Sequence, residues 1–299
     1  MEFRIIILVI IYFTIYIIHK YINKEYFENS IPVDYSIKQI KPEININPNA
    51  PIAFVYVYTP NIYDYCQHSI KNLTAYVRKY NYGLIVYSES FNSNVSACWN
   101  KIVAIRENLP NRKYIVWFDA DAIVNNFNIP IDSFINKYPD VDLIACLDIY
   151  KEKECINSGV MIIKNTSWSN NLFKKIWLSP ISHGHNDQNV IFYTIVQDLY
   201  PNAIQTLKNN KYCFTLSHPK VKILEENAFN TNIQSYNPGD FILHLMGQSK
   251  ESRINIMRQV NTSLGLDTYT KTECLNTLNN YFDSDRVDKI RNICFDSNT

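Results

Sequence analysis

Short apolar segments alternate with longer amphipathic ones from about residue 50 onwards. The runs Ile52–Tyr58 and Tyr82–Tyr87 are rich in β-branched and aromatic residues, which is typical of buried strands. The segments Tyr63–Tyr80 and Trp99–Leu109 carry apolar residues three and four positions apart, which is typical of helices. With the apolar run that begins at Ile115, this order predicts a parallel sheet with right-handed crossovers. No GxGxxG turn follows the first strand, so a dinucleotide-binding fingerprint is missing.

The third predicted strand runs into an acidic pair. The segment Ile115–Val124 reads IVWFDADAIV, so four apolar residues are followed by Asp119 and Asp121. If the strand continues through the pair, both carboxylates point to one side, because strand side chains alternate. Ligands of open α/β sheets bind at this end of the strands, and two such carboxylates need a cation to offset their repulsion and desolvation. A divalent metal site is one interpretation, a solvated acidic turn is the other, and this motif alone favours neither.

The remaining apolar segments extend this pattern towards the C-terminus. We expect helices over Trp168–Trp177 and Asn189–Leu199, and strands over Val141–Cys146, over the VMIIKN segment after Gly159 and over Phe241–Leu245.

Two positions in this part of the chain carry candidate chemistry. Asp187 and Gln188 come just before a predicted helix, where they either cap its first turn or contribute to a site. His244 lies on the last predicted strand, where an imidazole is either a satisfied core residue or a ligand. Lys250 and Arg253 follow it closely, and cations at that spacing favour a site for a metal and a phosphate.

Composition and charge narrow the class of protein. Of the 299 residues, 46% are apolar and 19% are charged, which is typical of a globular chain with a large core. The 29 Lys and Arg residues nearly cancel the 28 Asp and Glu residues, so we expect no nucleic-acid partner. The seven cysteines are an odd number. In an oxidising compartment at least one is unpaired or joins another chain, whereas in a cytosol or virion all would be reduced.

The N-terminal residues predict a membrane anchor. The stretch Ile5–Ile18 has no charge, and with its flanks Phe3–Ile22 it reaches the roughly 20 residues that span a bilayer. Bulky residues follow it where a cleaved signal peptide needs small ones, so we expect an uncleaved signal anchor over residues 1–24. Residues 25–50, which contain several Pro and Asn, are expected to form a stem, and the folded domain to begin near Pro51.

Flanking charges barely decide which side of the membrane the domain occupies. The glycosylation sequons fit a luminal domain, but each is weak evidence in an Asn-rich chain; they begin at Asn72, Asn94, Asn165 and Asn261. Residues 263–299 are expected to form a helical tail that Cys274 and Cys294 could staple.

Five motifs, in order, resemble glycosyltransferase family 34, the galactosyl-, mannosyl- and xylosyltransferases of the fungal and plant Golgi. They are Trp99-x-Lys101, Asp119-Ala120-Asp121, Asn157-Ser158-Gly159 with VMIIKN-x-x-Trp168, Asp187-Gln188, and FILHLMG over Phe241–Gly247. The resemblance extends over about Pro51–Lys250, and the anchor and stem match the usual type II layout of that family. The chain departs from the family at Ala120, where Ser is frequent, and at Gln248 and Ser249, which separate Gly247 from Lys250.

The resemblance implies an α/β fold of the GT-A type, with a Rossmann-like, mostly parallel central sheet flanked by helices. This would form a single catalytic domain over residues 51–262, after the transmembrane helix. It also implies a retaining transfer of a hexose or pentose from a nucleotide sugar, with UDP or GDP, to a glycan or glycoprotein acceptor. The cofactor would be Mn²⁺ or Mg²⁺. The implied location is a single-pass type II membrane protein facing the Golgi or ER lumen, or a host or viral membrane for a viral source, with homo- or hetero-oligomers allowed.

The resemblance also assigns roles to residues. Asp119, Asp121 and His244 would hold the metal, and Asp187 and Gln188 would lie at the reacting carbon as the catalytic pair. The donor would be contacted at its nucleotide, diphosphate and sugar by Thr59, Tyr63, Lys101, Asn157, Gly159, Gly247 and Lys250.

Two other functions remain open at this point. A phosphatase of the haloacid dehalogenase type also has an apolar strand that ends in an acidic motif, and FDADAIV fits it loosely. That motif normally follows the first strand of its domain, whereas here two strand–helix units precede it. The second alternative is a catalytically inactive, anchored relative that binds glycans or scaffolds active partners.

Overall fold

The computed structural model describes residues 36–148, 156–179, 187–199, 218–237 and 239–267. The chain divides into two units, Met1–Ser36 and Ile37–Thr299, and only the second is described below. The predicted anchor and the Cys274–Cys294 pair lie outside the described residues. Within the described ranges, no helix is both long enough and apolar enough to cross a bilayer.

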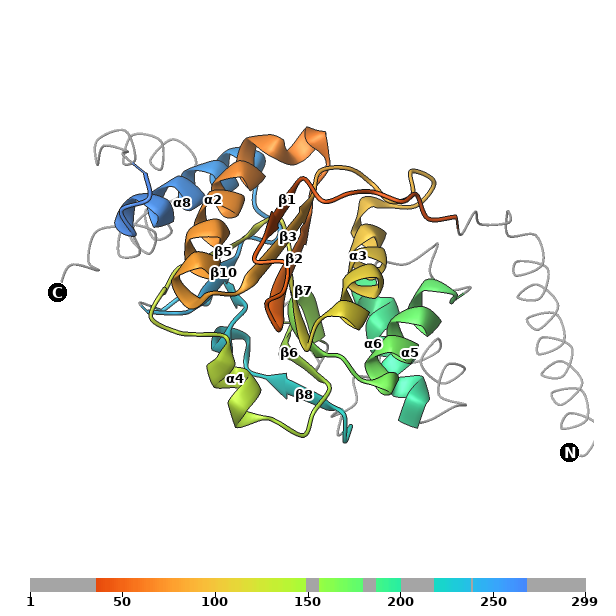
Figure 1. The fold of residues 1–299 in the computed structure, drawn as a ribbon. Coiled ribbons are helices and arrows are strands. Elements are labelled where there is room, and N and C mark those ends of the chain that lie inside the picture. Colours follow the sequence, from red (N-terminus) through yellow and green to blue (C-terminus); the bar gives the residue numbers. More distant parts are fainter. Residues whose placement is uncertain (1–35, 149–155, 180–186, 200–217, 238, 268–299) are drawn as a thin grey trace, which may run out of the picture. The chain divides into compact units, whose positions relative to one another are not determined.

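A seven-stranded sheet forms the centre of the second unit, in the order β1-β3-β2-β4-β7-β6-β8 (Figure 1). Its strands are β1 (Ile44–Ile46), β2 (Ile52–Val57), β3 (Gly83–Tyr87), β4 (Tyr114–Phe118), β6 (Leu143–Leu147), β7 (Ile156–Lys164) and β8 (Val221–Leu224). The pairs β2–β3, β2–β4 and β6–β8 are parallel, whereas β1 and β7 run antiparallel to their neighbours.

The sheet is therefore mixed. The expected mostly parallel order holds for β2, β3, β4, β6 and β8, which run in one direction, whereas β7, like the edge strand β1, runs against them. The reason lies in the connection from β6 to β7, which comprises only residues 148–155. A parallel crossover needs a dozen or more residues, so this short connection returns β7 antiparallel to β6. β4 then also pairs with β7 in the antiparallel sense.

Helices cover both faces of the central sheet (Figure 1). One face packs against α2 (Tyr63–Tyr80) and α8 (Lys250–Ser263), and the other against α3 (Asn100–Asn108), α5 (Ser167–Trp177) and α6 (Asp187–Leu199). Along β2, Phe54 and Tyr56 belong to the first core, whereas Ala53 and Val55 belong to the second. This alternation is that of a strand buried on both faces, which explains why β2 and β4 are continuously apolar.

A second, three-stranded sheet comprises β5 (Ala122–Val124), β10 (Ile242–His244) and β9 (Thr231–Asn232) in that order. β10 is antiparallel to β5, with His244 opposite Ala122, and parallel to β9. The strand does not continue through the acidic pair, because β4 ends at Phe118 and a turn leads into β5. In that turn the amide of Ala122 donates to the carbonyl of Asp119 at 3.0 Å.

The folded unit begins before the predicted boundary at Pro51. β1 lies in the segment expected to be stem and pairs antiparallel with β3, so that Ile46 is opposite Leu84. A three-residue edge strand has too few apolar positions to give a periodic signal, and the prolines around it hide it further.

Two of the predicted sequons are structural. Asn72 and Asn261 are fully buried, and the Asn72 amide donates to Asn261 Oδ1 at 3.1 Å. The Asn72 side chain also bonds both main-chain groups of Val124, donating to its carbonyl at 3.0 Å and accepting from its amide at 2.9 Å. Asn94 is exposed and Asn165 is half-buried. In the folded unit, Asn72 therefore attaches α2 to β5 and α8.

We expect Asn72→Ala to lower the free energy of unfolding by about 2–4 kcal/mol, because it leaves buried main-chain groups of Val124 without partners. Asn111→Ala is the matched control, since Asn111 is exposed. Urea denaturation of both variants measures the effect. Equal stability of the two variants would show that Asn72 does not hold β5.

Candidate active site

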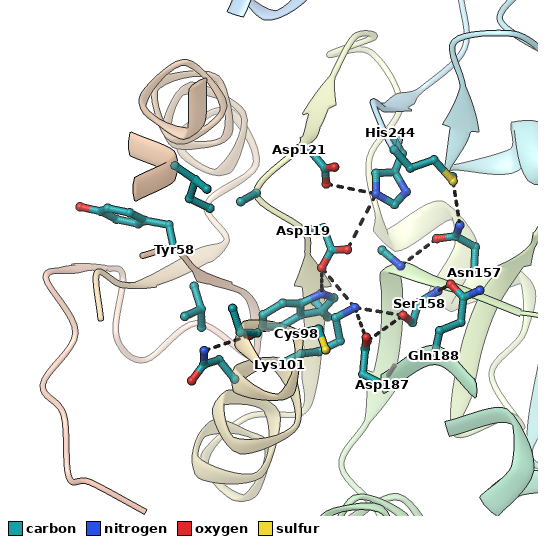
Figure 2. Close-up of a pocket in the computed structure, with 18 of the residues that line it drawn as sticks. Tyr58, Cys98, Lys101, Asp119, Asp121, Asn157, Ser158, Asp187, Gln188 and His244 are labelled. Carbon is teal, nitrogen blue, oxygen red and sulfur yellow. Dashed lines mark hydrogen bonds and ion pairs between the residues drawn. The ribbon is translucent and has the colours of Figure 1, made fainter. Parts of the chain in front are cut away.

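A cavity of about 400 Å³ opens at the carboxyl ends of β2 and β4. Its walls also include the first turns of α3 and α6, the start of β7 and the chain after β10 (Figure 2). Of the predicted site residues, those that line it are Thr59, Lys101, Asp119, Asp121, Asn157, Gly159, Asp187, Gln188, His244 and Gly247. Tyr63 and Lys250 do not line it.

Asp119, Asp121 and His244 meet at one side of this cavity (Figure 2). The Nε2 atom of His244 lies 3.2 Å from Asp121 Oδ1 and 3.8 Å from Asp119 Oδ2. One ligand atom from each residue falls within 4.8 Å of the others. Neighbouring ligands of an octahedral ion with bonds of about 2.1 Å are about 3 Å apart, so these atoms are spaced for a common cation.

The position of the His244 ring depends on Gly159. A Cβ atom added at Gly159 would lie 2.0 Å from Cε1 and 2.5 Å from Nδ1 of the imidazole, so only glycine leaves room for the ring. Among the described residues His244 Nδ1 has no hydrogen-bond partner, although it is buried, while Nε2 faces the carboxylates. Two carboxylate oxygens and one imidazole nitrogen are a donor set that suits Mn²⁺ and similar divalent ions. The residues thus fit a metal site.

Burial and neighbouring charges shift the pKa values of the residues in this cluster. Burial alone would raise the pKa of Asp121, but His244 and Arg253 outweigh burial and lower it to about 2. Burial would lower the pKa of His244, but Asp121 and Asp119 raise it. The pKa of Asp119 is raised mainly by burial, against the effect of Lys101.

Lys101 joins the acidic pair to Asp187. Its ammonium lies 2.7 Å from Asp187 Oδ2 and 3.2 Å from Asp119 Oδ1, and it donates to the hydroxyl of Ser158 at 3.0 Å. The residue is only 3% exposed. Burial would lower the pKa of this ammonium, but the two aspartates outweigh burial and raise it. The lysine therefore faces the carboxylates at the base of the cavity.

Asp187 and Gln188 begin α6, and both contact Ser158 (Figure 2). Asp187 Oδ2 accepts from the Ser158 hydroxyl at 3.0 Å as well as from Lys101. Gln188 Oε1 accepts from the Ser158 amide at 3.1 Å, and its Nε2 donates to Asp148 Oδ2 at 2.6 Å. Both ends of the Gln188 side chain are thereby held in place.

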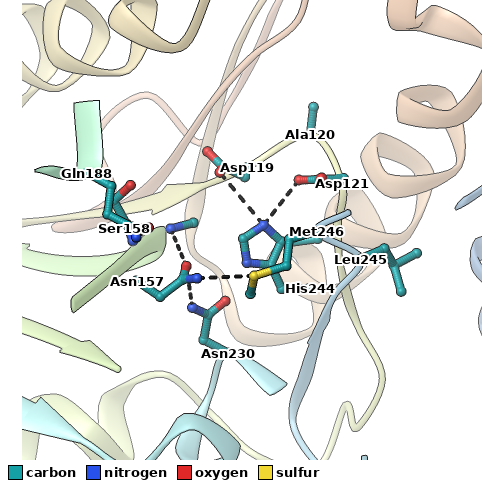
Figure 3. A network of polar contacts seen from close by, with 12 residues as sticks. Asp119, Ala120, Asp121, Asn157, Ser158, Gln188, Asn230, His244, Leu245 and Met246 are labelled. Carbon is teal, nitrogen blue, oxygen red and sulfur yellow. Dashed lines mark hydrogen bonds and ion pairs between the residues drawn. The ribbon is translucent and has the colours of Figure 1, made fainter. Parts of the chain in front are cut away.

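Asn157 forms a second polar network behind His244 (Figure 3). Its Oδ1 accepts from the Gly159 amide and from Asn230 Nδ2, both at 2.8 Å, and its Nδ2 donates to Met246 Sδ at 3.4 Å. Asn157 is only 2% exposed. Its amide therefore ties β7 to the chain before β9 and to the chain after β10.

Local sequence reasoning missed the contacts that Trp117 and Asp148 make. Trp117 Nε1 donates to Asp119 Oδ1 at 2.6 Å, and Asp148 holds Gln188 from the end of β6. Lys250 pairs with Asp64 on α2, and Arg253, one turn further along α8, reaches Asp121 Oδ2 at 2.8 Å. Position was the only available signal: Trp117 precedes Asp119 by two residues, and Arg253 follows Lys250 by three.

Part of the sequence matches the model of a known protein family. The model of the galactosyl transferase GMA12/MNN10 family, glycosyltransferase family 34, matches residues 55–146, which contain the acidic pair and Lys101. No curated protein matches the sequence.

Several solved structures are similar in fold. A glycosyltransferase involved in the glycosylation of the major capsid of PBCV-1 is 18% identical, with a TM-score of 0.52 over 69% of this chain and 98% of that chain. The glycosyltransferase GlyE of Streptococcus pneumoniae TIGR4 is 13% identical, with a TM-score of 0.45 over 81% and 63%. The galactosyltransferase LgtC, in complex with donor and acceptor sugar analogs, is 12% identical, with a TM-score of 0.45 over 76% and 100%.

The family match confirms the resemblance over the part of the chain that contains the first two of the five motifs, and the first of the solved structures shows the fold. The chain is similar to glycosyltransferase family 34 over residues 55–146, and its second unit has the mixed α/β fold of the GT-A glycosyltransferases.

Proposed function

We propose that this chain is a metal-dependent, retaining glycosyltransferase that moves a hexose or pentose from a UDP- or GDP-sugar to a glycan or glycoprotein acceptor. The observation that carries the proposal is the convergence of Asp119, Asp121 and His244 at one side of a cavity of about 400 Å³. Such a cavity is of the size that small ligands occupy.

The metal would be held by Asp119, Asp121 and His244. Bound there, Mn²⁺ or Mg²⁺ would act as a Lewis acid that offsets charge on the departing diphosphate. Thr59 and Gly247, which line the same cavity, would contact the donor. Tyr63 and Lys250 would contact only a donor that extends beyond this cavity.

Asp187 and Gln188 would act on the reacting carbon through charge and orientation. The transferred sugar passes through an oxocarbenium-like state, which a nearby carboxylate stabilises. Asp187 Oδ2 is paired with Lys101 and bonded to Ser158, and an anion held in this way is a weaker nucleophile. This supports attack by the acceptor on the same face of the sugar, with Asp187 as an electrostatic partner and Gln188 as an orienting amide.

The proposal extends to the location of the enzyme. Residues 1–24 would anchor it as a type II membrane protein facing the Golgi or ER lumen, or the equivalent side of a host or viral membrane. Its association into homo- or hetero-oligomers is part of the same proposal.

The structure favours transfer over the phosphatase alternative. A haloacid dehalogenase phosphatase uses the first Asp of its motif as a nucleophile, whereas Asp119 Oδ1 is already held by Trp117 and Lys101 in a fold of the GT-A type. A glycan-binding relative would retain the same residues without turnover. Assays with a panel of UDP- and GDP-sugars and Mn²⁺ separate the three, since a phosphatase would release phosphate from simple esters and a binding protein would turn over nothing.

We expect Asp121→Ala to abolish metal-dependent transfer, with a loss of at least about 100-fold, because a carboxylate ligand is removed. The variant should stay folded, as judged by circular dichroism. Asp140→Ala is the matched control because Asp140 is exposed. Turnover of Asp121→Ala at the wild-type rate would remove Asp121 from the site.

We expect Gly159→Ala to weaken Mn²⁺ binding by at least about 10-fold, because the added methyl group displaces the His244 ring. Gly83→Ala is the control, since its Cβ would also be tight, at 3.0 Å from Ala53 Cβ, but away from the cavity. Both variants should lose stability, and only Gly159→Ala should lose metal affinity in an Mn²⁺ titration. Unchanged affinity in Gly159→Ala would show that the ring position does not depend on this glycine.

A further inference from the structure

Each carboxylate of the candidate metal site presents one oxygen to His244 and the other to a donor from the protein. Asp119 directs Oδ2 towards the imidazole, while its Oδ1 accepts from Trp117 Nε1 at 2.6 Å and lies 3.2 Å from the Lys101 ammonium. Asp121 directs Oδ1 towards the imidazole, while its Oδ2 accepts from Arg253 at 2.8 Å. The outer oxygens are thus held, and the inner oxygens converge.

Arg253 is itself fixed by groups other than Asp121. Its Nε donates to the main-chain carbonyl of Leu245, directly after β10, at 3.2 Å. Its guanidinium carbon lies 5.1 Å from the centre of the Tyr65 ring, which belongs to α2 and is buried. The guanidinium is therefore held by α2 and by the chain that carries His244, independently of its contact with Asp121.

We propose that Arg253 is a positioning residue that sets the orientation of Asp121, so that Oδ1 of this carboxylate faces the metal. This inference rests on the proposed function. A planar guanidinium can donate from Nε and a terminal nitrogen to two acceptors at once, which a lysine ammonium on a flexible stem does less well. Partners that hold a metal-ligating side chain typically change metal affinity by 10- to 100-fold when they are removed.

Simple electrostatics predicts the opposite sign. A positive charge beside Asp121 repels a cation and competes with it for the carboxylate. If Arg253 were only a counter-ion, its removal would therefore strengthen metal binding. The direction of the change thus separates a positioning role from a neutralising one.

The test is a titration of the full-length protein with Mn²⁺ alone, followed by the electron paramagnetic resonance signal of the free ion. We expect Arg253→Met to weaken Mn²⁺ binding by about 10- to 100-fold. Arg253→Lys keeps the charge and most of the stem, so it should fold even if Arg253→Met does not, and it should bind more weakly than wild type. Arg78→Met, at an exposed arginine of α2, is the control and should bind like wild type.

The outcomes distinguish this inference from the proposed function. Weaker binding by both Arg253 variants supports the positioning role. Binding by Arg253→Met or Arg253→Lys that equals or exceeds wild type overturns it, while the metal site stands if Asp121→Ala still abolishes binding. A wild-type protein that binds no Mn²⁺ overturns the metal site and this inference together.

Discussion

The antiparallel pairing of β5 with β10 is the constraint on which the candidate site depends. It places His244 opposite Ala122, and the Leu245 amide donates to the carbonyl of Asp121 at 2.9 Å. Main-chain hydrogen bonds thus bring the imidazole to the carboxylates across more than a hundred residues of sequence. The Asn72 side chain also bonds β5, through both main-chain groups of Val124. The ring of His244 can take its position beside the carboxylates because Gly159 has no side chain in the space that the ring occupies.

A second feature is the balance of charge around the cavity. Asp119, Asp121 and Asp187 would repel one another strongly in a partly buried space. Lys101 lies between the first and the last of them, and Arg253 pairs with Asp121. Breaking such a pair by removing one partner leaves an uncompensated charge, which is more costly than the pair itself is favourable. The acidic cluster is therefore compatible with folding, and its geometry is set by the chain.

Much of the fold followed from periodicity, and much of the site followed from resemblance. The predicted Tyr63–Tyr80 helix coincides with α2, because its apolar positions recur at helical spacing and Asn81 ends it in a left-handed conformation. The acidic pair is visible in sequence because it interrupts an apolar run. That His244 lies beside it could be inferred only from the family pattern, since no local signal encodes a pairing between distant strands.

Other features were beyond sequence reasoning for identifiable reasons. The alternation of strand side chains places Asp119 and Asp121 on one side only if a single strand runs through both. The chain instead turns there and continues in another sheet. The contacts of Ser158 and Asn230 join segments that are far apart in sequence, so no spacing rule reports them. Nothing in the sequence around Lys101 indicates that its ammonium forms ion pairs with both Asp119 and Asp187.

For the luminal location that we propose, the mutual burial of Asn72 and Asn261 would have a consequence for biosynthesis. Oligosaccharyltransferase would meet the chain during translocation, before α8 has been made and packed against α2. An N-linked glycan attached to Asn72 at that stage could not be buried later. In the modified molecule α8 would be unable to pack against α2. In a secretory compartment, burial of Asn72 during folding would therefore compete with its glycosylation.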